Sequence, residues 1–300
     1  MKRASGPGQQ TARQVVVERE RSGRALVTVA VSLYDYRDYV VSCLDSVRAQ
    51  TIRDLDLVIV DDASRDGGAD VAGQWLEENG DRFCRCVLVR HDRNEGLAAA
   101  RNTAFAHART DYVFVLDADN LLYPRCLEQL ASALSQSGAS FAYCYLEKFG
   151  ELSGLHNIRP WRPEDLQGGN RIDAMVLLRR SVWQSVDGYS DDMPAMGWED
   201  FELWFKIARL KGWGIQVPEI LGRYCVHRDS MLQTVTNPQL DSLWAYLRSK
   251  YPEFFAGRSL EGSRLAGPSD GATAWRGTPG MVTDRRRQAD ELSDNDCTLL

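Results

Sequence analysis

The sequence lacks the cysteine patterns that staple small secreted domains together or bind zinc. Its seven cysteines are scattered along 300 residues, their number is odd, and no CxxC pair occurs. A disulfide framework and a cysteine-rich zinc site are therefore excluded. Several cysteines lie in apolar stretches, which is typical of buried thiols in a reducing compartment, and we expect a cytoplasmic protein.

Long apolar runs and a secretory leader are also missing. No stretch approaches the roughly 18 apolar residues that a membrane-spanning helix needs. The basic start MKRASGPGQQTARQ is not followed by an apolar region. We expect a soluble chain without a transmembrane segment, which still leaves room for peripheral contact with a membrane.

An excess of positive charge is absent as well. The chain has 36 basic and 42 acidic residues, for a formal net charge of -6. Since a nucleic-acid surface needs a basic stripe, we expect no nucleic acid partner. Two phosphate-binding signatures are missing too: there is no GxxxxGK[ST] loop, and no GxGxxG follows the first predicted strand.

The chain does contain apolar runs of strand length that alternate with amphipathic helical patterns. This alternation predicts βαβ crossovers, and hence an α/β domain with a mostly parallel sheet flanked by helices. The predicted elements are strands over 25–34, 55–62, 85–91 and 112–119, and helices over 40–50, 68–80 and 96–109.

Composition changes near both ends of the chain. The first residues are polar and rich in Gly, Gln and Arg, and from about residue 257 Gly, Ser, Pro, Asp and Arg dominate. We predict a flexible N-terminal tail over 1–24, a single domain over 25–256 and a disordered C-terminal tail over 257–300.

Carboxylates end two of the predicted strands. LDLVIVDD ends at Asp62, and YVFVLDAD ends with Asp117 and Asp119 around one small residue. Such groups taken singly are more often solvated turns or helix caps. In a parallel sheet, however, ligands bind beyond the carboxyl ends of the strands, so both groups should line one crevice. Carboxylate oxygens there suit Mg²⁺ or Mn²⁺, which often bridge to phosphates, and the predicted ligand is a nucleoside diphosphate.

Two further stretches supply candidate groups. RNEGLAAARN offers Arg93 and Arg101, together with a helix N-terminus that could face an anion. GWEDFELWFKIARLKGWG predicts an amphipathic helix with Glu199 and Asp200 in its first turn. Acids are common there because they suit the helix dipole, and the same dipole would keep a general base ionised. His227 stands alone, and a lone histidine is more often structural than a ligand.

Taken in order, these motifs resemble the family-2 inverting glycosyltransferases of GT-A fold over about residues 27–231. The resemblance implies a GT-A (Rossmann-like) domain that transfers a sugar from a nucleotide-sugar donor, usually a UDP-sugar, with inversion and with Mn²⁺ or Mg²⁺. The acceptor could be a glycan, a lipid, a peptide or a metabolite. The motifs that carry the resemblance are VSLYDYRDYVVSCLDSVRAQT, LVIVDDASRDG, RNEGLAAARN, YVFVLDADNLLYP, RRSVWQSVDGYSDDM, GWEDFELWFKIA and RYCVHRDSM.

The resemblance also assigns roles residue by residue. It implies that the metal is held by Asp119, with Asp117 and His227 as further candidates. It implies that Asp200, rather than Glu199, is the catalytic base. Donor contacts fall on Ser32, Tyr34, Asp62, Arg93 and Arg101. The first motif reads SLYD where the family commonly has Pro-Thr-Tyr-Asn. The contacts with the nucleobase, and therefore the choice of UDP as the nucleotide, stay open.

Two other functions compete with this interpretation. A nucleotidyltransferase would need a glycine- and lysine-bearing loop after the first strand, which the sequence lacks. A nucleotide-sugar sensor without activity would not need both acidic motifs intact. Release of free UDP from a UDP-sugar distinguishes the transferase from both.

Overall fold

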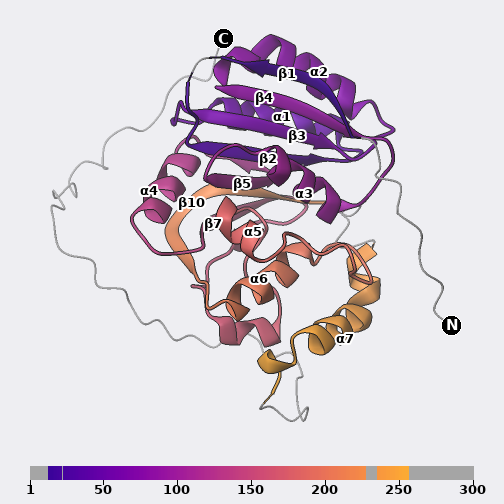
Figure 1. Ribbon diagram of the computed structural model, residues 1–300, viewed down its shortest axis with the longest axis vertical. Coiled ribbons are helices and arrows are strands. Elements are labelled where there is room, and N and C mark those ends of the chain that lie inside the picture. The colour runs from indigo at the N-terminus through magenta and orange to yellow at the C-terminus, as the bar shows by residue number, and fades with distance from the viewer. Residues whose placement is uncertain (1–12, 22, 228–234, 257–300) are drawn as a thin grey trace, which may run out of the picture. The chain divides into compact units, whose positions relative to one another are not determined.

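The computed structural model describes residues 13–21, 23–227 and 235–256. Ten strands form one sheet in the order β1-β4-β3-β2-β5-β9-β7-β10-β6, with β8 paired to β7 (Figure 1). The strands are β1 Arg13–Glu20, β2 Val27–Leu33, β3 Leu55–Asp61, β4 Arg85–His91, β5 Tyr112–Asp117, β6 Leu121–Leu122, β7 Phe141–Gly150, β8 Gly154–His156, β9 Leu177–Arg179 and β10 Gly214–Val226.

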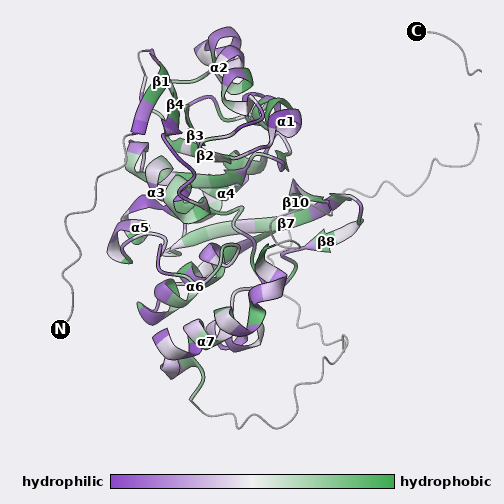
Figure 2. Ribbon diagram, turned by 90° about the vertical axis from the view of Figure 1, so that its right-hand side faces the viewer, coloured by the Kyte–Doolittle hydropathy of each residue, from purple (hydrophilic) through white to green (hydrophobic). Residues whose placement is uncertain are grey.

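Helices cover both faces of this sheet, so its central strands are buried on both sides. Every residue of β2 and β3 is buried, and these strands are coloured mainly hydrophobic in Figure 2. One apolar core joins the sheet to α1, α2 and α4, and a second joins it to α3, α6 and α7. The helices are α1 Arg37–Arg48, α2 Gly68–Asn79, α3 Leu97–His107, α4 Cys126–Ser135, α5 Arg180–Ser185, α6 Glu199–Arg209 and α7 Leu240–Lys250.

The first half of the domain follows the predicted alternation. β2, β3, β4 and β5 run parallel to one another, and α1, α2 and α3 connect them. Continuous apolar runs form these strands because a parallel sheet covered by helices offers no exposed face. The prediction of an α/β domain with a mostly parallel sheet is confirmed.

The predicted N-terminal tail over 1–24 is wrong for its later part. β1 pairs antiparallel with β4 and contains an irregularity in register between Val15 and Val17. This strand is mostly exposed and carries charges of both signs. Such composition is typical of an edge strand protected against further pairing, and it conceals the strand from a hydrophobicity pattern. The predicted C-terminal tail from 257 lies outside the described residues.

The second half of the domain is mixed and was not predicted in detail. β7 runs parallel to β10 and antiparallel to β9, and β9 is antiparallel to β5. α6 packs against this part, with Trp204 stacked on Phe141 of β7 at 4.7 Å between ring centroids. The predicted amphipathic helix is therefore present, and its buried aromatic face fixes where its first turn lies. None of the helices within the described ranges has the length and apolarity to span a bilayer.

Candidate functional site

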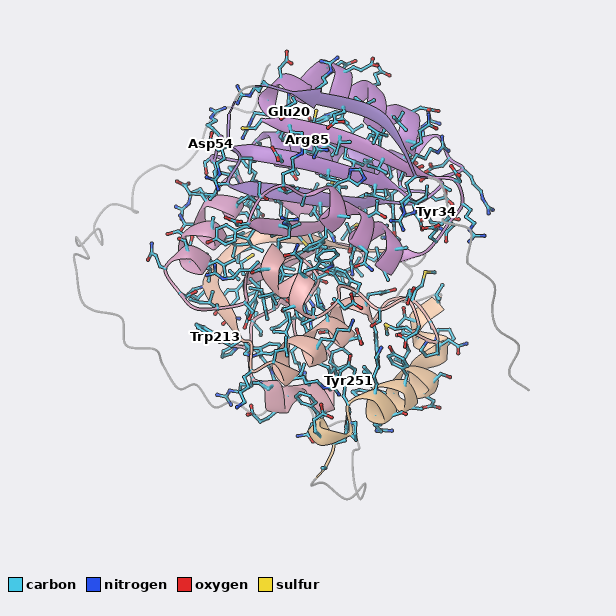
Figure 3. All side chains as sticks on the ribbon, in the orientation of Figure 1. Glu20, Tyr34, Asp54, Arg85, Trp213 and Tyr251 are labelled. Atoms are coloured by element: carbon cyan, nitrogen blue, oxygen red, sulfur yellow. The ribbon has the colours of Figure 1, made fainter. Side chains whose placement is uncertain are left out.

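The carboxyl ends of β2, β3 and β5 meet at one edge of the sheet. In the parallel register, Ser32 of β2 stands opposite Val60 of β3 and Asp117 of β5. Figure 3 shows Tyr34, which follows β2, at the other end of the strands from Asp54. The acidic residues that end β3 and β5 therefore share one edge, as the sequence predicted.

Asp62, directly after β3, is held by the protein itself. Its carboxylate is 4 % exposed and lies 2.7 Å from Nδ1 of His91. It accepts hydrogen bonds from the backbone N–H groups of Glu95 (2.8 Å) and Gly96 (2.7 Å). Nε2 of His91 lies 2.9 Å from Oγ1 of Thr103 on α3. Asp62 thus fixes the loop between β4 and α3, and reading a nucleobase would require it to share or exchange these partners.

Asp117, at the end of β5, is paired with a buried arginine. Nη2 of Arg101 lies 3.0 Å from Oδ1 and 3.1 Å from Oδ2 of Asp117. Burial alone would lower the pKa of Arg101, but the charge of Asp117, together with those of Tyr189, Glu199 and Asp200, raises it. The Arg101 guanidinium is therefore charged, and Asp117 already has a positive partner. The Nε atom of Arg101 is buried without a hydrogen-bond partner.

Asp119 lies two residues further on and has a weaker partner. Its Oδ2 is 3.2 Å from Nε2 of His227, which is itself 3.3 Å from the hydroxyl of Tyr36. Burial and the neighbouring Asp117 raise the pKa of Asp119 to about 6, although the contact with His227 opposes this shift. The structure therefore joins Asp119 to His227, two of the predicted metal ligands, although 108 residues separate them.

A divalent cation fits Asp119 and His227. No group of three or more His, Cys, Asp or Glu side chains within 13–21, 23–227 and 235–256 is arranged to hold a metal ion. Magnesium, however, is commonly bound through one or two carboxylates with the remaining ligands from waters and substrate phosphates. A buried carboxylate whose pKa is raised by a second acid is the environment that such a cation would stabilise.

The first turn of α6 presents two buried acids with different partners. Glu199 is 2 % exposed, and its Oε2 accepts a hydrogen bond from the backbone N–H of Gly197 at 2.7 Å. Asp200 is 7 % exposed, and its Oδ2 accepts one from Nδ2 of Asn170 at 2.8 Å. Burial raises the pKa of both acids, and the charge of Arg101 opposes the shift. Glu199 therefore accepts a hydrogen bond at its own helix terminus, whereas Asp200 contacts the segment that contains Asn170.

A third acid in this region, Asp173, was missed by the sequence analysis. Its carboxylate accepts a hydrogen bond from the backbone N–H of Met175 at 2.9 Å. Burial and the charge of Asp200 raise its pKa to about 7, and Asp117 contributes to the shift. The only signal in the sequence was an acid just before an apolar run. Asp173 completes what we term the acidic cluster: Asp117, Asp119, Asp173, Glu199 and Asp200.

Three other predicted donor contacts have distinct placements. Ser32 is 8 % exposed at the end of β2, and its carbonyl accepts a hydrogen bond from the backbone N–H of Ala118. Tyr34 is half-buried just after this strand. Arg93 is exposed in the loop before α3, so Arg101 is the arginine that the fold turns toward the acids.

Comparison with known proteins identifies relatives of this chain. The model of the family "Glycosyl transferase family 2" matches residues 28–185. EpsE of Bacillus subtilis (strain 168), described as a glycosyltransferase, is 26 % identical over 211 residues, which cover 68 % of this chain and 73 % of that protein.

Solved structures share the fold. Staphylococcus aureus TarS 1-349 in complex with UDP-GlcNAc aligns with a TM-score of 0.59 and 15 % identity, covering 70 % of this chain and 61 % of TarS 1-349. The mannosyltransferase PcManGT of Pyrobaculum calidifontis, in complex with GDP-Man and Mn²⁺, aligns with a TM-score of 0.53 and 24 % identity, covering 72 % and 61 %. The chain therefore spans about three fifths of each of these two structures.

Proposed function

Because the chain belongs to glycosyl transferase family 2 and has the GT-A fold, we propose that it transfers a sugar from a UDP-sugar to an acceptor hydroxyl with inversion. The proposed reaction is a single displacement in which the acceptor oxygen replaces the diphosphate at the anomeric carbon; a divalent cation, Mn²⁺ or Mg²⁺, would supply positive charge beside the departing diphosphate. The observation that carries the proposal is the acidic cluster, in which Asp117 and Asp119 lie at the carboxyl end of β5 and Arg101 compensates Asp117.

The donor end of the proposed site is built on the strand ends. Asp119 and His227 would hold the cation, which when bound neutralises charge on the diphosphate. Ser32 lies near the end of β2 and Tyr34 follows it, where a nucleoside can lie against the sheet edge. Asp62 is proposed to contact the base, in addition to fixing its loop. Solved relatives bound to UDP-GlcNAc or to GDP-Man and Mn²⁺ support the class of donor.

Two arginines have different proposed roles. Arg101 is buried and charged, so it would hold Asp117 in place and lend its field to the diphosphate. Arg93 is exposed in the loop before α3, and we propose that it contacts the donor from the surface. The difference in burial makes Arg101 the more important of the two.

Asp200 is the proposed general base. The acceptor hydroxyl would attack the anomeric carbon on the face opposite the diphosphate while Asp200 takes the proton. Burial raises the pKa of Asp200 and so increases its basicity, while Arg101 keeps it able to ionise. Glu199 is a poorer candidate because it is the less exposed of the two acids, at 2 % against 7 %, and its carboxylate is held by the backbone N–H of Gly197 at its own helix terminus.

The proposal is tested by incubating the full chain with a panel of UDP- and GDP-sugars and a panel of acceptors, with Mn²⁺ or with a chelator. We expect release of nucleoside diphosphate and a sugar-bearing product detected by mass spectrometry, both lost with the chelator. Pyrophosphate among the products would instead indicate nucleotidyl transfer, and donor binding without any turnover would indicate a sensor. We propose the cytoplasm as the compartment, since the six cysteines of the described residues are free and buried.

A further inference from the structure

Asn170, which no motif singled out, contacts the proposed base directly. It follows the 3₁₀ turn Pro163–Gly168 and Gly169. Its Oδ1 lies 3.3 Å from the backbone N–H of Ile172, and its Nδ2 lies 2.8 Å from Oδ2 of Asp200. Since the N–H of Ile172 can only donate, it fixes the sense of the amide. The NH₂ group is thereby directed at the carboxylate of Asp200.

The segment that carries Asn170 is tied to the same helix as Asp200. The carbonyl of Ile172 accepts a hydrogen bond from Nε1 of Trp204, one turn along α6, at 3.0 Å. The N–H of Asp173 donates to Oδ1 of Asn157 at 2.8 Å. Asn157 in turn accepts a bond from Gln216 of β10 through its carbonyl oxygen. These bonds tie the residues that follow Asn170 to α6 and, through Asn157, to β10.

We infer that Asn170 is a positioning residue, which holds Oδ2 of Asp200 so that Oδ1 is directed to the acceptor hydroxyl. The inference rests on the proposed role of Asp200 as general base. Without the amide, the carboxylate keeps the backbone N–H of Phe201 as a donor but loses the side-chain hydrogen bond that fixes its rotation about χ2 and favours its ionised form. Orientation of a catalytic group supplies a substantial part of many rate enhancements, so a misdirected base slows the chemical step without weakening donor binding.

The charges around Asp200 determine how its ionisation should respond. Arg101 opposes the effect of burial, whereas Asp117 and Asp173 add to it. Glu199 precedes Asp200 on α6, and the hydroxyls of two tyrosines, Tyr189 and Tyr224, also sense its charge. Removal of the Asn170 donor therefore leaves an acid surrounded mainly by acids, and its pKa should rise.

The test compares Asn170→Ala and Asn170→Asp with Asn79→Ala. Asn79 also donates an amide hydrogen bond, to the carbonyl of Trp75 at 3.0 Å, but lies at the end of α2 away from the acidic cluster. For Asn170→Ala we expect kcat to fall about 10- to 100-fold, with the donor Kd unchanged. The acid limb of the kcat–pH profile should move up by about one pH unit. Asn170→Asp should have the larger effect, because it replaces a donor by a second carboxylate.

A measurement that does not depend on turnover separates this inference from the proposed function. The carboxyl pKa of Asp200, followed by ¹³C NMR in the parent and in Asn170→Ala, should rise in the variant. An unchanged Asp200 pKa overturns the inference whatever the enzyme does. So does a kcat loss in Asn170→Ala that matches Asn79→Ala with an unmoved pH profile. If the parent transfers no sugar from any donor, the proposed function fails instead, and the NMR titration still decides whether Asn170 controls Asp200.

Discussion

The end of β3 and the acidic cluster each contain a largely buried aspartate, but the two aspartates have different hydrogen-bond partners. At the end of β3, the carboxylate of Asp62 has two backbone N–H groups and the imidazole of His91 as partners. In the acidic cluster, Asp119 has the contact with His227 and its own backbone N–H to set against burial and the charge of Asp117. Both carboxylates are largely buried, with 4 % and 12 % of the side chain exposed.

The difference teaches that burial alone does not identify a ligand site. A buried carboxylate is stable when fixed donors replace its hydration, and Asp62 meets this condition within the protein. The acidic cluster does not, since the pKa values of Asp119 and Asp173 are raised to about 6 and about 7. The remaining electrostatic cost can be relieved by protonation or by a bound cation, and it is the second outcome that the proposed function uses.

The largest predicted effect follows from replacing the proposed general base, Asp200, in the acidic cluster. Asp200→Asn keeps size and shape but cannot accept a proton, so we expect kcat to fall by about 10²–10⁴-fold. The donor Kd should barely change. Steady-state kinetics and calorimetry with UDP measure both. Glu199→Gln is the matched control and should retain most of the turnover. Full activity in Asp200→Asn combined with an inactive Glu199→Gln would reverse the two roles.

The next effect concerns the proposed metal site. Asp119→Asn should weaken metal-dependent donor binding by about 100-fold, because a ligand of the cation is lost. It should not lower the free energy of unfolding, since it removes a charge that burial disfavours. Calorimetry with UDP in the presence of Mn²⁺, together with urea unfolding, checks both expectations. Unchanged UDP affinity in the presence of the metal would remove Asp119 from the site.

The end of β3 should respond in the opposite way. Asp62→Ala leaves two backbone N–H groups and His91 without their acceptor, so the free energy of unfolding should fall by about 1–3 kcal/mol. UDP binding should weaken by about the same amount if Asp62 reads the base. Asp62→Asn keeps one acceptor oxygen and should lose less stability. A variant that is destabilised but binds UDP as well as the parent would assign Asp62 to the loop alone.

The smallest predicted effect is a change in how stability depends on pH. Asp173 has a folded-state pKa of about 7 against an ordinary value of 3.8, so the fold retains a proton that the unfolded chain releases. Stability should therefore fall as pH rises from about 4 to about 7. Asp173→Asn should remove about 1–2 kcal/mol of this decline, measured by urea unfolding without added metal. Parallel stability–pH curves for parent and variant would contradict the prediction.

Much of the fold was predictable because its signals are local. The predicted strand over 55–62 is β3, Leu55–Asp61, and the predicted helix over 68–80 is α2, Gly68–Asn79. Each rests on a periodicity that can be read within one segment. β1 was not predicted because an exposed edge strand has no apolar period. The mixed part from β7 to β10 was not predicted in detail because its strand pairings join distant segments.

The candidate site was predictable only as a set of residues. The motifs identified Asp119 and His227 separately, but their contact at 3.2 Å depends on how β10 is placed against β6 and β7. Neither Asn170 nor Asp173 belongs to a motif, although both lie among the proposed catalytic groups.

By itself the sequence determined the family, the alternation of strands and helices, and which acids lie at strand ends. Only the tertiary structure decided what partners those acids have. It gave Asp62 its three donors, paired Asp117 with Arg101, and set Asn170 against Asp200. The physical reason is that apolar periodicity acts between near neighbours in the chain. The charge state of a carboxylate depends instead on burial and on donors that folding brings together from distant segments.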